Sequence, residues 1–356
     1  MSICAIVMAA GEGRRMNSKK CKFIQKTAGK PIIIWVRDAL RQAGADEQVY
    51  IVGHLQEQVR QVLGEDVAFV LQEKQLGTGH AVMQASPFLE GRQGITLVIR
   101  GDTPLITAET LKNVMDFFNE GKYAAVIITA DTNESTGYGK IVRNQGGNVA
   151  EIVINNGNSN GMFGGMFEGN SSMYCFDTAL LVSVLGRIGC NNANREYCLT
   201  DAIGILIEDG RKVGAYKAPF EETLGVNDKY QLMQISKLLN RRICRNHMKE
   251  GVTIVDPDTT WIEASVRISR DAEILPDTIL EGMTFIGEDA VIGPQTRLTD
   301  TIVEDEAVIY NSIIAGSTVR TGACIGPYSY VRTGSVIGSH ARIGNSVEVK
   351  NAQIGE

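Results

Sequence analysis

Residues 3–16 read ICAIVMAAGEGRRM, an apolar run followed directly by a loop with two glycines and two arginines. The run predicts a buried strand, and a glycine loop that leads from a strand into a helix lets backbone N–H groups approach phosphate oxygens. A dinucleotide-binding fingerprint has a third glycine where Met16 stands, and a Walker A loop has Gly-Lys-Ser/Thr, which is absent. The stretch therefore predicts a different kind of anion site, with a tight turn carrying exposed arginines as the alternative.

Two cations belong to this candidate site, Arg15 and, seven residues later, Lys22. The planar fork of arginine and the point charge of lysine suit a triphosphate, whose leaving pyrophosphate gains charge in the transition state. Both are candidate catalytic residues.

Short apolar runs alternate with amphipathic segments from this loop as far as about residue 228. The runs predict strands over 3–8, 48–52, 68–71, 95–99, 124–129 and 213–217, and the amphipathic segments predict helices over 31–42, 55–63, 79–84, 107–120 and 177–185. This alternation is typical of a Rossmann-like α/β domain, whose mostly parallel sheet is covered on both faces. Ligands of such sheets bind at the C-terminal ends of the strands.

The pattern changes at about residue 252, where aliphatic residues begin to recur every six positions. They are Ile268, Ile274, Ile286, Ile292, Leu280 and Leu298, and after a slip in phase Val319, Ile325, Val331, Ile337, Ile343 and Val349. A hexapeptide period predicts a left-handed parallel β-helix, with the aliphatic side chains filling the interior. Glycine often follows the aliphatic, as in Ile286-Gly287 and Ile325-Gly326, and we expect it to take the tight corner position.

These two periods set the expected domains. They are an α/β domain over residues 1–228, a linker helix over 229–250 and a β-helix over 251–356. The chain stops in the middle of a repeat, which would leave an open coil. We expect it to be truncated there, with coverage of the open end by neighbouring subunits as the alternative.

Composition excludes several classes of protein. A net charge of −6 with no basic block argues against a nucleic-acid partner. No apolar stretch is long enough to cross a membrane, and the first strand lacks the basic flank of a signal peptide. The seven cysteines show no paired spacing, which suits reduced thiols in the cytoplasm.

Two further motifs carry candidate binding residues. In 71–81, LQEKQLGTGHA, the amide of Gln72 and the backbone at Gly77 and Thr78 offer the donors and acceptors that read the edge of a base. In 97–105, LVIRGDTPL, Asp102 follows a predicted buried strand. One carboxylate is enough to begin a Mg²⁺ site, because Mg²⁺ keeps several waters and takes phosphate oxygens. His80 is a candidate base catalyst, with a packed or capping histidine as the favoured alternative, and a structural turn aspartate is the alternative at Asp102.

The motifs MAAGEGRRM, QLGTGHA, RGDTPLI, TGYGKI, EYCLTDAI and GVND occur in this order before the hexapeptide repeats. This set resembles the sugar nucleotidyltransferase superfamily. Within it, the set is similar to the bifunctional N-acetylglucosamine-1-phosphate uridyltransferase / glucosamine-1-phosphate N-acetyltransferase family. The resemblance covers essentially the whole chain. It implies that the phosphate of a sugar 1-phosphate attacks the α-phosphorus of UTP, giving a UDP-sugar and pyrophosphate. It also implies Mg²⁺ as cofactor, a homotrimer built through the β-helix, a cytoplasmic location and a role in cell-wall precursor synthesis.

The resemblance carries roles to matching positions of this sequence. It implies that Ala10, Gly11, Gln72, Gly77 and Thr78 hold uridine, that Arg15 and Lys22 bind the phosphates, that Asp102 and Asn227 bind Mg²⁺, that Gly139, Asn170 and Thr200 face the sugar, and that Arg332 and Lys350 contact the sugar of an acetyltransferase site. The histidine that acts as general base of that second site falls beyond the last residue here, so we expect the acetyltransferase site to be incomplete.

The departures from the family pattern lie around the acceptor sugar. Ile154 stands where the family has a glutamate, Ser171-Ser172 where it has Thr-Gly, Leu224 where it has a glutamate, and Arg100 where it has a tyrosine; Cys21 replaces a proline before the lysine. The segment 155–172 is rich in Asn, Gly and Ser, which predicts a mobile flap or an ordinary surface loop. Two alternatives follow: a uridylyltransferase for another sugar 1-phosphate, and a catalytically weak nucleotide-sugar-binding or scaffold protein.

Overall fold

The computed structural model describes residues 2–133, 138–153, 165–190 and 195–356. The chain forms two compact units, one made of Met1–Gln25 and Pro31–Ile235 and the other of Lys26–Lys30 and Ser236–Glu356. Helix α8 (Lys229–Lys249) begins in the first unit and ends in the second. The boundaries at 228 and 250 therefore stay a prediction, because the first unit ends and the second begins inside this helix.

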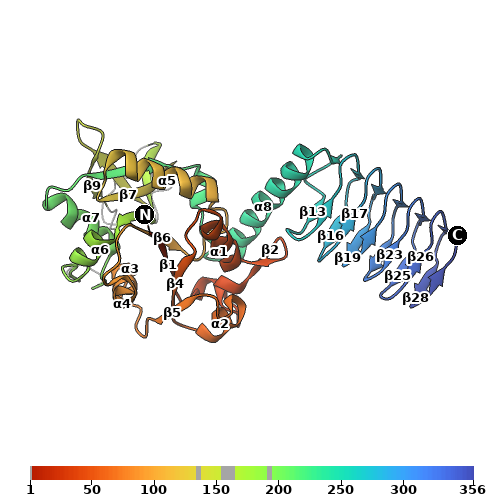
Figure 1. Ribbon diagram of the computed structural model, residues 1–356, viewed down its shortest axis with the longest axis horizontal. Helices are drawn as coiled ribbons and strands as arrows, with labels where there is room; N and C mark the ends of the chain where they lie inside the picture. Colours follow the sequence, from red (N-terminus) through yellow and green to blue (C-terminus); the bar gives the residue numbers. More distant parts are fainter. Residues whose placement is uncertain (1, 134–137, 154–164, 191–194) are drawn as a thin grey trace. The chain divides into compact units, whose positions relative to one another are not determined.

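The first unit is built on a twisted mixed sheet (Figure 1). Its strand order is β11 (Val213–Lys217), β7 (Ala125–Thr132), β10 (Phe167–Asp177), β6 (Ile95–Arg100), β1 (Ile3–Ala9), β4 (Glu47–Val52) and β5 (Ala68–Leu71). All neighbours are parallel except β10, which runs antiparallel to both β7 and β6. The hairpin β8 (Gly139–Arg143) and β9 (Val149–Val153) extends from β10. The expectation of a Rossmann-like, mostly parallel sheet is confirmed.

Helices cover both faces of this sheet, because successive residues of each strand point to opposite sides. On β1, Val7 packs into one buried cluster with α1 (Ile32–Gln42), α2 (Gln56–Leu63) and α5 (Ala108–Gly121). Its neighbour Ile6 packs into a second cluster with α3 (Thr78–Gln84), α4 (Ser86–Leu89), α6 (Thr178–Leu185) and α7 (Leu199–Glu208). Short 3-10 helices η1 (Arg14–Met16), η2 (Lys22–Ile24) and η3 (Phe220–Thr223) complete the unit.

The flap expected over 155–172 is wrong for its last residues. Residues 167–172 belong to β10, which lies between two other strands, and Asn170 and Ser171 are buried. Their polar side chains find partners inside the sheet, since Ser171 Oγ donates to the Ile128 carbonyl at 2.6 Å. Composition misled the prediction because these polar groups are satisfied by neighbours rather than by water. The rest of the expected flap, 155–164, lies outside the described residues, as does Ile154.

The second unit contains a left-handed parallel β-helix made of three six-stranded parallel sheets. The first sheet is β12 (Thr253–Ile254), β15 (Glu273–Ile274), β18 (Val291–Ile292), β21 (Val308–Ile309), β24 (Cys324–Ile325) and β27 (Arg342–Ile343). The second is β13 (Trp261–Ile262), β16 (Ile279–Glu281), β19 (Arg297–Thr299), β22 (Ile313–Ala315), β25 (Tyr330–Arg332) and β28 (Glu348–Lys350). The third is β14 (Arg267–Ile268), β17 (Phe285–Ile286), β20 (Ile302–Val303), β23 (Thr318–Val319), β26 (Val336–Ile337) and β29 (Gln353–Ile354). The short pair β2 (Lys26–Thr27) and β3 (Lys30–Pro31) is a separate two-stranded sheet.

Every aliphatic residue of the predicted hexapeptide pattern is buried in one continuous core. The phase slip is also explained, because the step between successive core residues shortens from six to five at Val303, Ile314 and Val319. The parallel register is nevertheless kept, with Ile309 opposite both Ile292 and Ile325. The shorter steps are therefore absorbed at the corners.

The glycines that follow the aliphatics serve two different needs. Gly293 and Gly326 have φ of 108° and 118°, a region that favours glycine. Gly287 does not, but a Cβ there would collide with Asp305 of the next coil. Many of the left-handed corner residues are polar instead, for example Asp271, Asp289 and Glu306 in successive coils.

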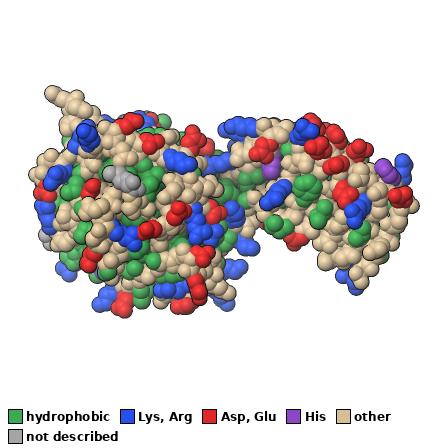
Figure 2. All heavy atoms as spheres, in the orientation of Figure 1, with side chains coloured by type: hydrophobic (Ala, Val, Ile, Leu, Met, Phe, Trp, Pro, Cys, Tyr) green, Lys and Arg blue, Asp and Glu red, His purple; other side chains and the backbone are tan. Residues whose placement is uncertain are grey.

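On the visible face, acidic side chains gather on the β-helix, whereas both signs of charge are interspersed over the first unit (Figure 2).

None of the helices in the described part of the chain has the length and apolar character needed to span a bilayer.

Candidate active site

A pocket of about 990 Å³ opens in the first unit, where β1, β5 and β6 end. This is the edge at which mostly parallel sheets bind ligands. It gathers all the predicted site residues of the first unit, namely Ala10, Gly11, Arg15, Lys22, Gln72, Gly77, Thr78, Asp102, Gly139, Asn170, Thr200 and Asn227. Arg332 and Lys350 lie in the second unit, in adjacent coils with their Cα atoms in register.

The glycine loop and Lys22 are packed against each other. A Cβ added at Gly13, where φ is 63°, would lie 3.1 Å from Lys22 Cβ, and one added at Gly11 would lie 3.9 Å from Lys22 Cε. The absence of a side chain on Gly13 therefore lets the lysine stem lie along the loop, whereas a Cβ at Gly11 would make only an ordinary contact with it. Arg15 lines the same pocket and is exposed, while Arg14 forms an ion pair with Glu12 outside it.

The second motif forms a rigid wall of the pocket. Gln72 is buried, and its Nε2 donates to the Gly77 carbonyl at 3.2 Å and lies 3.0 Å from His80 Nδ1. His80 thus packs behind Gln72, as the packed alternative for this residue predicted. Thr78 Oγ1 accepts a hydrogen bond from the Leu199 N–H at 3.0 Å, which ties α3 to the start of α7. The Gln72 amide is therefore held in one orientation before any ligand arrives.

The resemblance implies that this pocket binds UTP, and on that expectation Gly77→Ala should weaken UTP binding strongly. Gly77 has φ of 110°, and a Cβ there would collide with the Tyr197 carbonyl. The strained turn would displace both the Gly77 carbonyl and the Gln72 amide that it accepts from. We predict a rise in the Kd for UTP of about 10-fold or more, since each disturbed contact is worth about 1 kcal/mol. Calorimetric titration with UTP measures it, and Gly91→Ala, which has open space outside the pocket, is the matched positive-φ control.

The charged centre of the pocket is Asp102, which follows β6. Its side chain is 7% exposed; Oδ2 accepts from Lys22 Nζ at 2.5 Å and Oδ1 accepts from Arg100 Nε at 3.1 Å. Burial alone would raise the pKa of the Asp102 carboxyl, but Arg100 and Lys22 outweigh it and lower the pKa to about 2. Burial would likewise lower the pKa of Arg100, and Asp102 outweighs it, so that this pKa is raised. Asp102 and Arg100 are therefore both charged at neutral pH.

This lowered pKa predicts an acid-dependent loss of stability. The stabilisation from ionised Asp102 is present above the unfolded pKa near 4 and is lost as pH falls through about 2. The pKa difference corresponds to about 2 kcal/mol. We expect the urea midpoint of the wild type to fall between pH 4 and pH 2 by more than that of Asp102→Asn. Parallel decreases in both proteins would show that Asp102 carries no such stabilisation.

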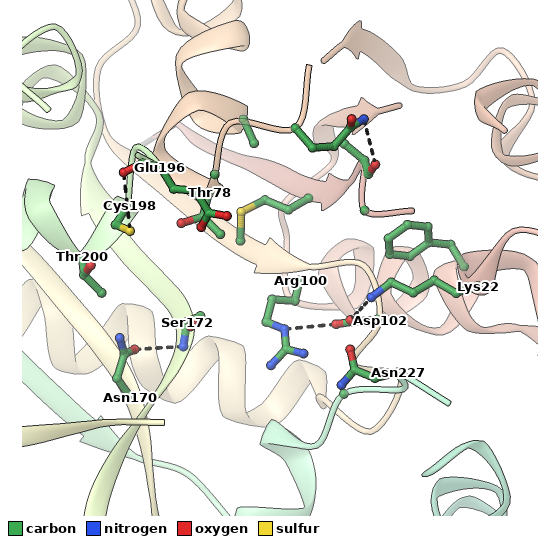
Figure 3. A pocket seen from close by; sticks show the side chains of 18 of the residues that line it. Lys22, Thr78, Arg100, Asp102, Asn170, Ser172, Glu196, Cys198, Thr200 and Asn227 are labelled. Atoms are coloured by element: carbon green, nitrogen blue, oxygen red, sulfur yellow. Dashed lines mark hydrogen bonds and ion pairs between the residues drawn. The ribbon is translucent and has the colours of Figure 1, made fainter. Parts of the chain in front are cut away.

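The oxygen donors expected for a divalent cation lie together. The Val226 N–H donates to the Asp102 carbonyl at 2.9 Å, which places Asn227 at the same site, and its side chain lies beside Asp102 (Figure 3). The described residues hold no cluster of three or more His, Cys, Asp or Glu able to bind a metal by themselves. A hard cation that takes most of its ligands from phosphate and water fits this donor set. It would replace one of the cations that now contact the Asp102 carboxylate.

The opposite end of the pocket is formed by β8, β10 and α7. Gly139 pairs with Asn170 across the β8–β10 ladder, and a bulge follows Asn170 on β10. The Asn170 side chain accepts from the Ser172 N–H at 2.9 Å and donates to the Tyr174 hydroxyl at 3.0 Å. Thr200 lines this end, and its buried hydroxyl has no hydrogen-bond partner among the described residues.

Several pocket residues were not among the predicted site residues. They include Arg100, Tyr138, Ser172, Glu196, Cys198 and Leu224. For Arg100 the sequence carried a signal, because an arginine closes an otherwise apolar strand directly before Gly101-Asp102. Ser172, which follows the β10 bulge, was marked only as a departure from the family pattern. Nothing comparable marks Cys198, which lies in the segment directly before α7.

Comparison with known proteins agrees with this architecture. Residues 5–183 match the family model of the MobA-like NTP transferase domain, and residues 258–356 match that of the GMPPB C-terminal domain. An NTP transferase domain with a nucleotide-sized pocket at the strand ends, followed by a β-helix, defines a nucleotidyltransferase.

Curated relatives narrow this class. The "Bifunctional protein GlmU" of Acetivibrio thermocellus is 43% identical over 355 residues, which is 99% of this chain and 77% of the relative. Those of Geobacillus sp. and Brevibacillus brevis are each 44% identical, with the same shares covered. The chain belongs to the GlmU family.

Proposed function

We propose that this chain transfers UMP from UTP to N-acetylglucosamine 1-phosphate, giving UDP-N-acetylglucosamine and pyrophosphate. The observation that carries the proposal is the clustering of Lys22, Asp102 and Asn227 beside the glycine loop, in a pocket that also holds Gln72. A phosphate-binding loop, a base-reading amide and an oxygen donor pair are the parts that nucleotidyl transfer requires. Membership of the GlmU family supports the acceptor.

In the proposed reaction, a phosphate oxygen of the sugar 1-phosphate attacks the α-phosphorus of UTP. The bond from this phosphorus to the oxygen bridging the β-phosphorus breaks, and pyrophosphate leaves with the electron pair. No protein nucleophile takes part, because the acceptor is already an anion, so alignment and charge neutralisation supply the catalysis. Lys22 and Arg15 neutralise the triphosphate as it loses pyrophosphate.

The remaining residues bind and orient the substrates. We propose that Gln72, Gly77, Thr78, Ala10 and Gly11 hold uridine, and that Gly139, Asn170 and Thr200 hold the sugar. A divalent cation, which we propose is Mg²⁺ held by Asp102 and Asn227, supplies charge neutralisation and alignment of the phosphates when bound.

For the whole molecule we propose a cytoplasmic homotrimer formed through the β-helix, with Arg332 and Lys350 contacting the sugar of an acetyltransferase site. No disulfide joins any of the seven cysteines, all of which lie in the described part of the chain, and this supports a reducing compartment. Exposed apolar side chains on the β-helix strands, such as Phe285, Ile302 and Ile313, support burial against other subunits.

Pyrophosphate release from UTP with a panel of sugar 1-phosphates tests the proposal. Fastest turnover with N-acetylglucosamine 1-phosphate supports it. The second candidate, transfer to another sugar 1-phosphate, was suggested by Ile154 and the altered segment 155–172, and a different best acceptor would support it. No turnover with any acceptor would instead indicate a binding or scaffold protein.

A further inference from the structure

Arg100 is a pocket cation to which the proposed reaction gives no role. It is the last residue of β6, and its side chain is 24% exposed within the pocket wall. Arginine stays protonated at all working pH values and presents five N–H donors in a planar fork. Two of these meet described acceptors, Nε with Asp102 Oδ1 at 3.1 Å and Nη1 with the Ser171 carbonyl at 3.5 Å.

The space around the guanidinium is kept open by a glycine. A Cβ added at Gly225 would collide with Arg100 Nη2 and would lie 3.2 Å from Asp102 Oδ1. Residue 225 therefore has no side chain at the place where the Arg100 guanidinium and the Asp102 carboxylate meet. Such a fitted site indicates that Arg100 has a fixed place in the pocket.

This place lies between the two ends of the pocket. In Figure 3, Arg100 stands between the group of Lys22, Asp102 and Asn227 and the group of Asn170, Ser172 and Thr200. The first group faces the proposed triphosphate and the second the proposed sugar. The phosphate that joins the sugar to the attacking oxygen must lie between them.

The charges around Asp102 also favour the binding of a phosphate at Arg100. Asp102 supplies one negative charge, and Lys22 and Arg100 supply two positive charges in a mostly buried cluster. A divalent cation at Asp102 would add two more positive charges and free the guanidinium from one oxygen. An arriving phosphate dianion then offers Arg100 a bidentate partner.

We propose that Arg100 binds the phosphate of the acceptor sugar 1-phosphate and is held ready by Asp102 until that phosphate arrives. The inference rests on the proposed function and assigns a further residue to the same reaction. Two polyanions must meet for the attack to occur, so a fixed cation at the acceptor phosphate reduces their repulsion and aligns the attacking oxygen. This assigns acceptor recognition to Arg100 and triphosphate recognition to Lys22 and Arg15.

Steady-state kinetics of Arg100→Gln and Arg100→Lys test it. For Arg100→Gln we expect the KM of the sugar 1-phosphate to rise about 10- to 100-fold, as lost charged hydrogen bonds predict. The KM of UTP should change by less than about 3-fold. Arg100→Lys, which keeps the charge but loses the fork, should fall between. Arg187→Gln removes an exposed arginine that pairs with Asp209 outside the pocket, and should leave both constants unchanged.

A binding measurement separates contact with phosphate from a structural role. The enzyme is first saturated with α,β-methylene-UTP and then titrated with N-acetylglucosamine 1-phosphate or with N-acetylglucosamine. If Arg100 contacts the phosphate, Arg100→Gln loses the preference for the phosphorylated sugar and binds the free sugar as the wild type does. An equal loss for both ligands, or an unchanged acceptor KM, overturns the inference. Failure of the wild type to release pyrophosphate would instead overturn the proposed function, and any sugar 1-phosphate that binds still tests Arg100.

Discussion

Replacing Asp102 by alanine is expected to lower kcat for UMP transfer by about 10³-fold or more, since an electrostatic contact made in the transition state is worth several kcal/mol. The carboxylate is the only side chain that contacts both Lys22 and Arg100 in the described pocket. Without it the proposed cation loses its charged ligand, and the two side-chain cations lose the group that positions them.

The control for this prediction is a measurement of folding and stability in a second variant. Asp102→Asn keeps the shape and an oxygen at the site, and its melting temperature shows how much of any loss is structural. Binding of Mn²⁺, followed by electron paramagnetic resonance in the absence of substrates, should weaken in both variants. An alanine variant that is folded and fully active would show that Asp102 is not a metal ligand.

Replacing Ile309 by aspartate is expected to unfold the β-helix while leaving the first unit folded. Ile309 is fully buried on β21, with neighbours Ile292 and Ile325 directly above and below it. A carboxylate there has no partner and costs more than about 4 kcal/mol. Because each coil is stabilised by its neighbours, the loss spreads along the solenoid.

The two units have separate buried cores, which makes this prediction specific. The core clusters of the sheet contain only residues of the first unit, and the β-helix cluster only residues of the second. Calorimetry of Ile309→Asp should therefore lose one thermal transition and keep the other. The rate of UMP transfer should stay within about 3-fold of the wild-type rate, a difference of less than about 1 kcal/mol in activation free energy. Ile309→Val is the matched control. Parallel loss of both transitions would mean that the units unfold as one.

The β-helix was predictable almost residue by residue from the sequence. An aliphatic residue at every sixth position is compatible with few structures, because one such side chain per hexapeptide fills the narrow interior of the β-helix. Even the phase slip was visible, although its cause was not, because the shortened steps at Val303, Ile314 and Val319 are accommodated at corners that the pattern does not describe.

The first unit was predictable where each strand is a short apolar run. The prediction from sequence was wrong at β10, whose residues 169–172 read GNSS and carry a bulge in the middle of the sheet. Local composition favours a loop there, and only the neighbouring strands satisfy the polar groups. Because Asn170 and Ser172 reach the pocket at this bulge, the proposed acceptor end was the least predictable part of the site.

The proposed nucleotide end of the pocket was easier to predict, because its residues lie directly after predicted strands. Gly11, Gln72 and Asp102 each follow a strand of the parallel sheet, so topology alone brings them to one edge. What the sequence did not reveal is the pairing of Asp102 with both Lys22 and Arg100. That pairing depends on a contact between residues eighty positions apart, which no local pattern records.

The central claim is tested most directly by ³¹P nuclear magnetic resonance of the wild-type protein with UTP, Mg²⁺ and N-acetylglucosamine 1-phosphate. We predict that signals of UDP-N-acetylglucosamine and pyrophosphate grow in equal amounts, and that neither appears when the sugar phosphate is omitted. An unchanged spectrum from folded protein, or pyrophosphate released without the acceptor, would contradict the account.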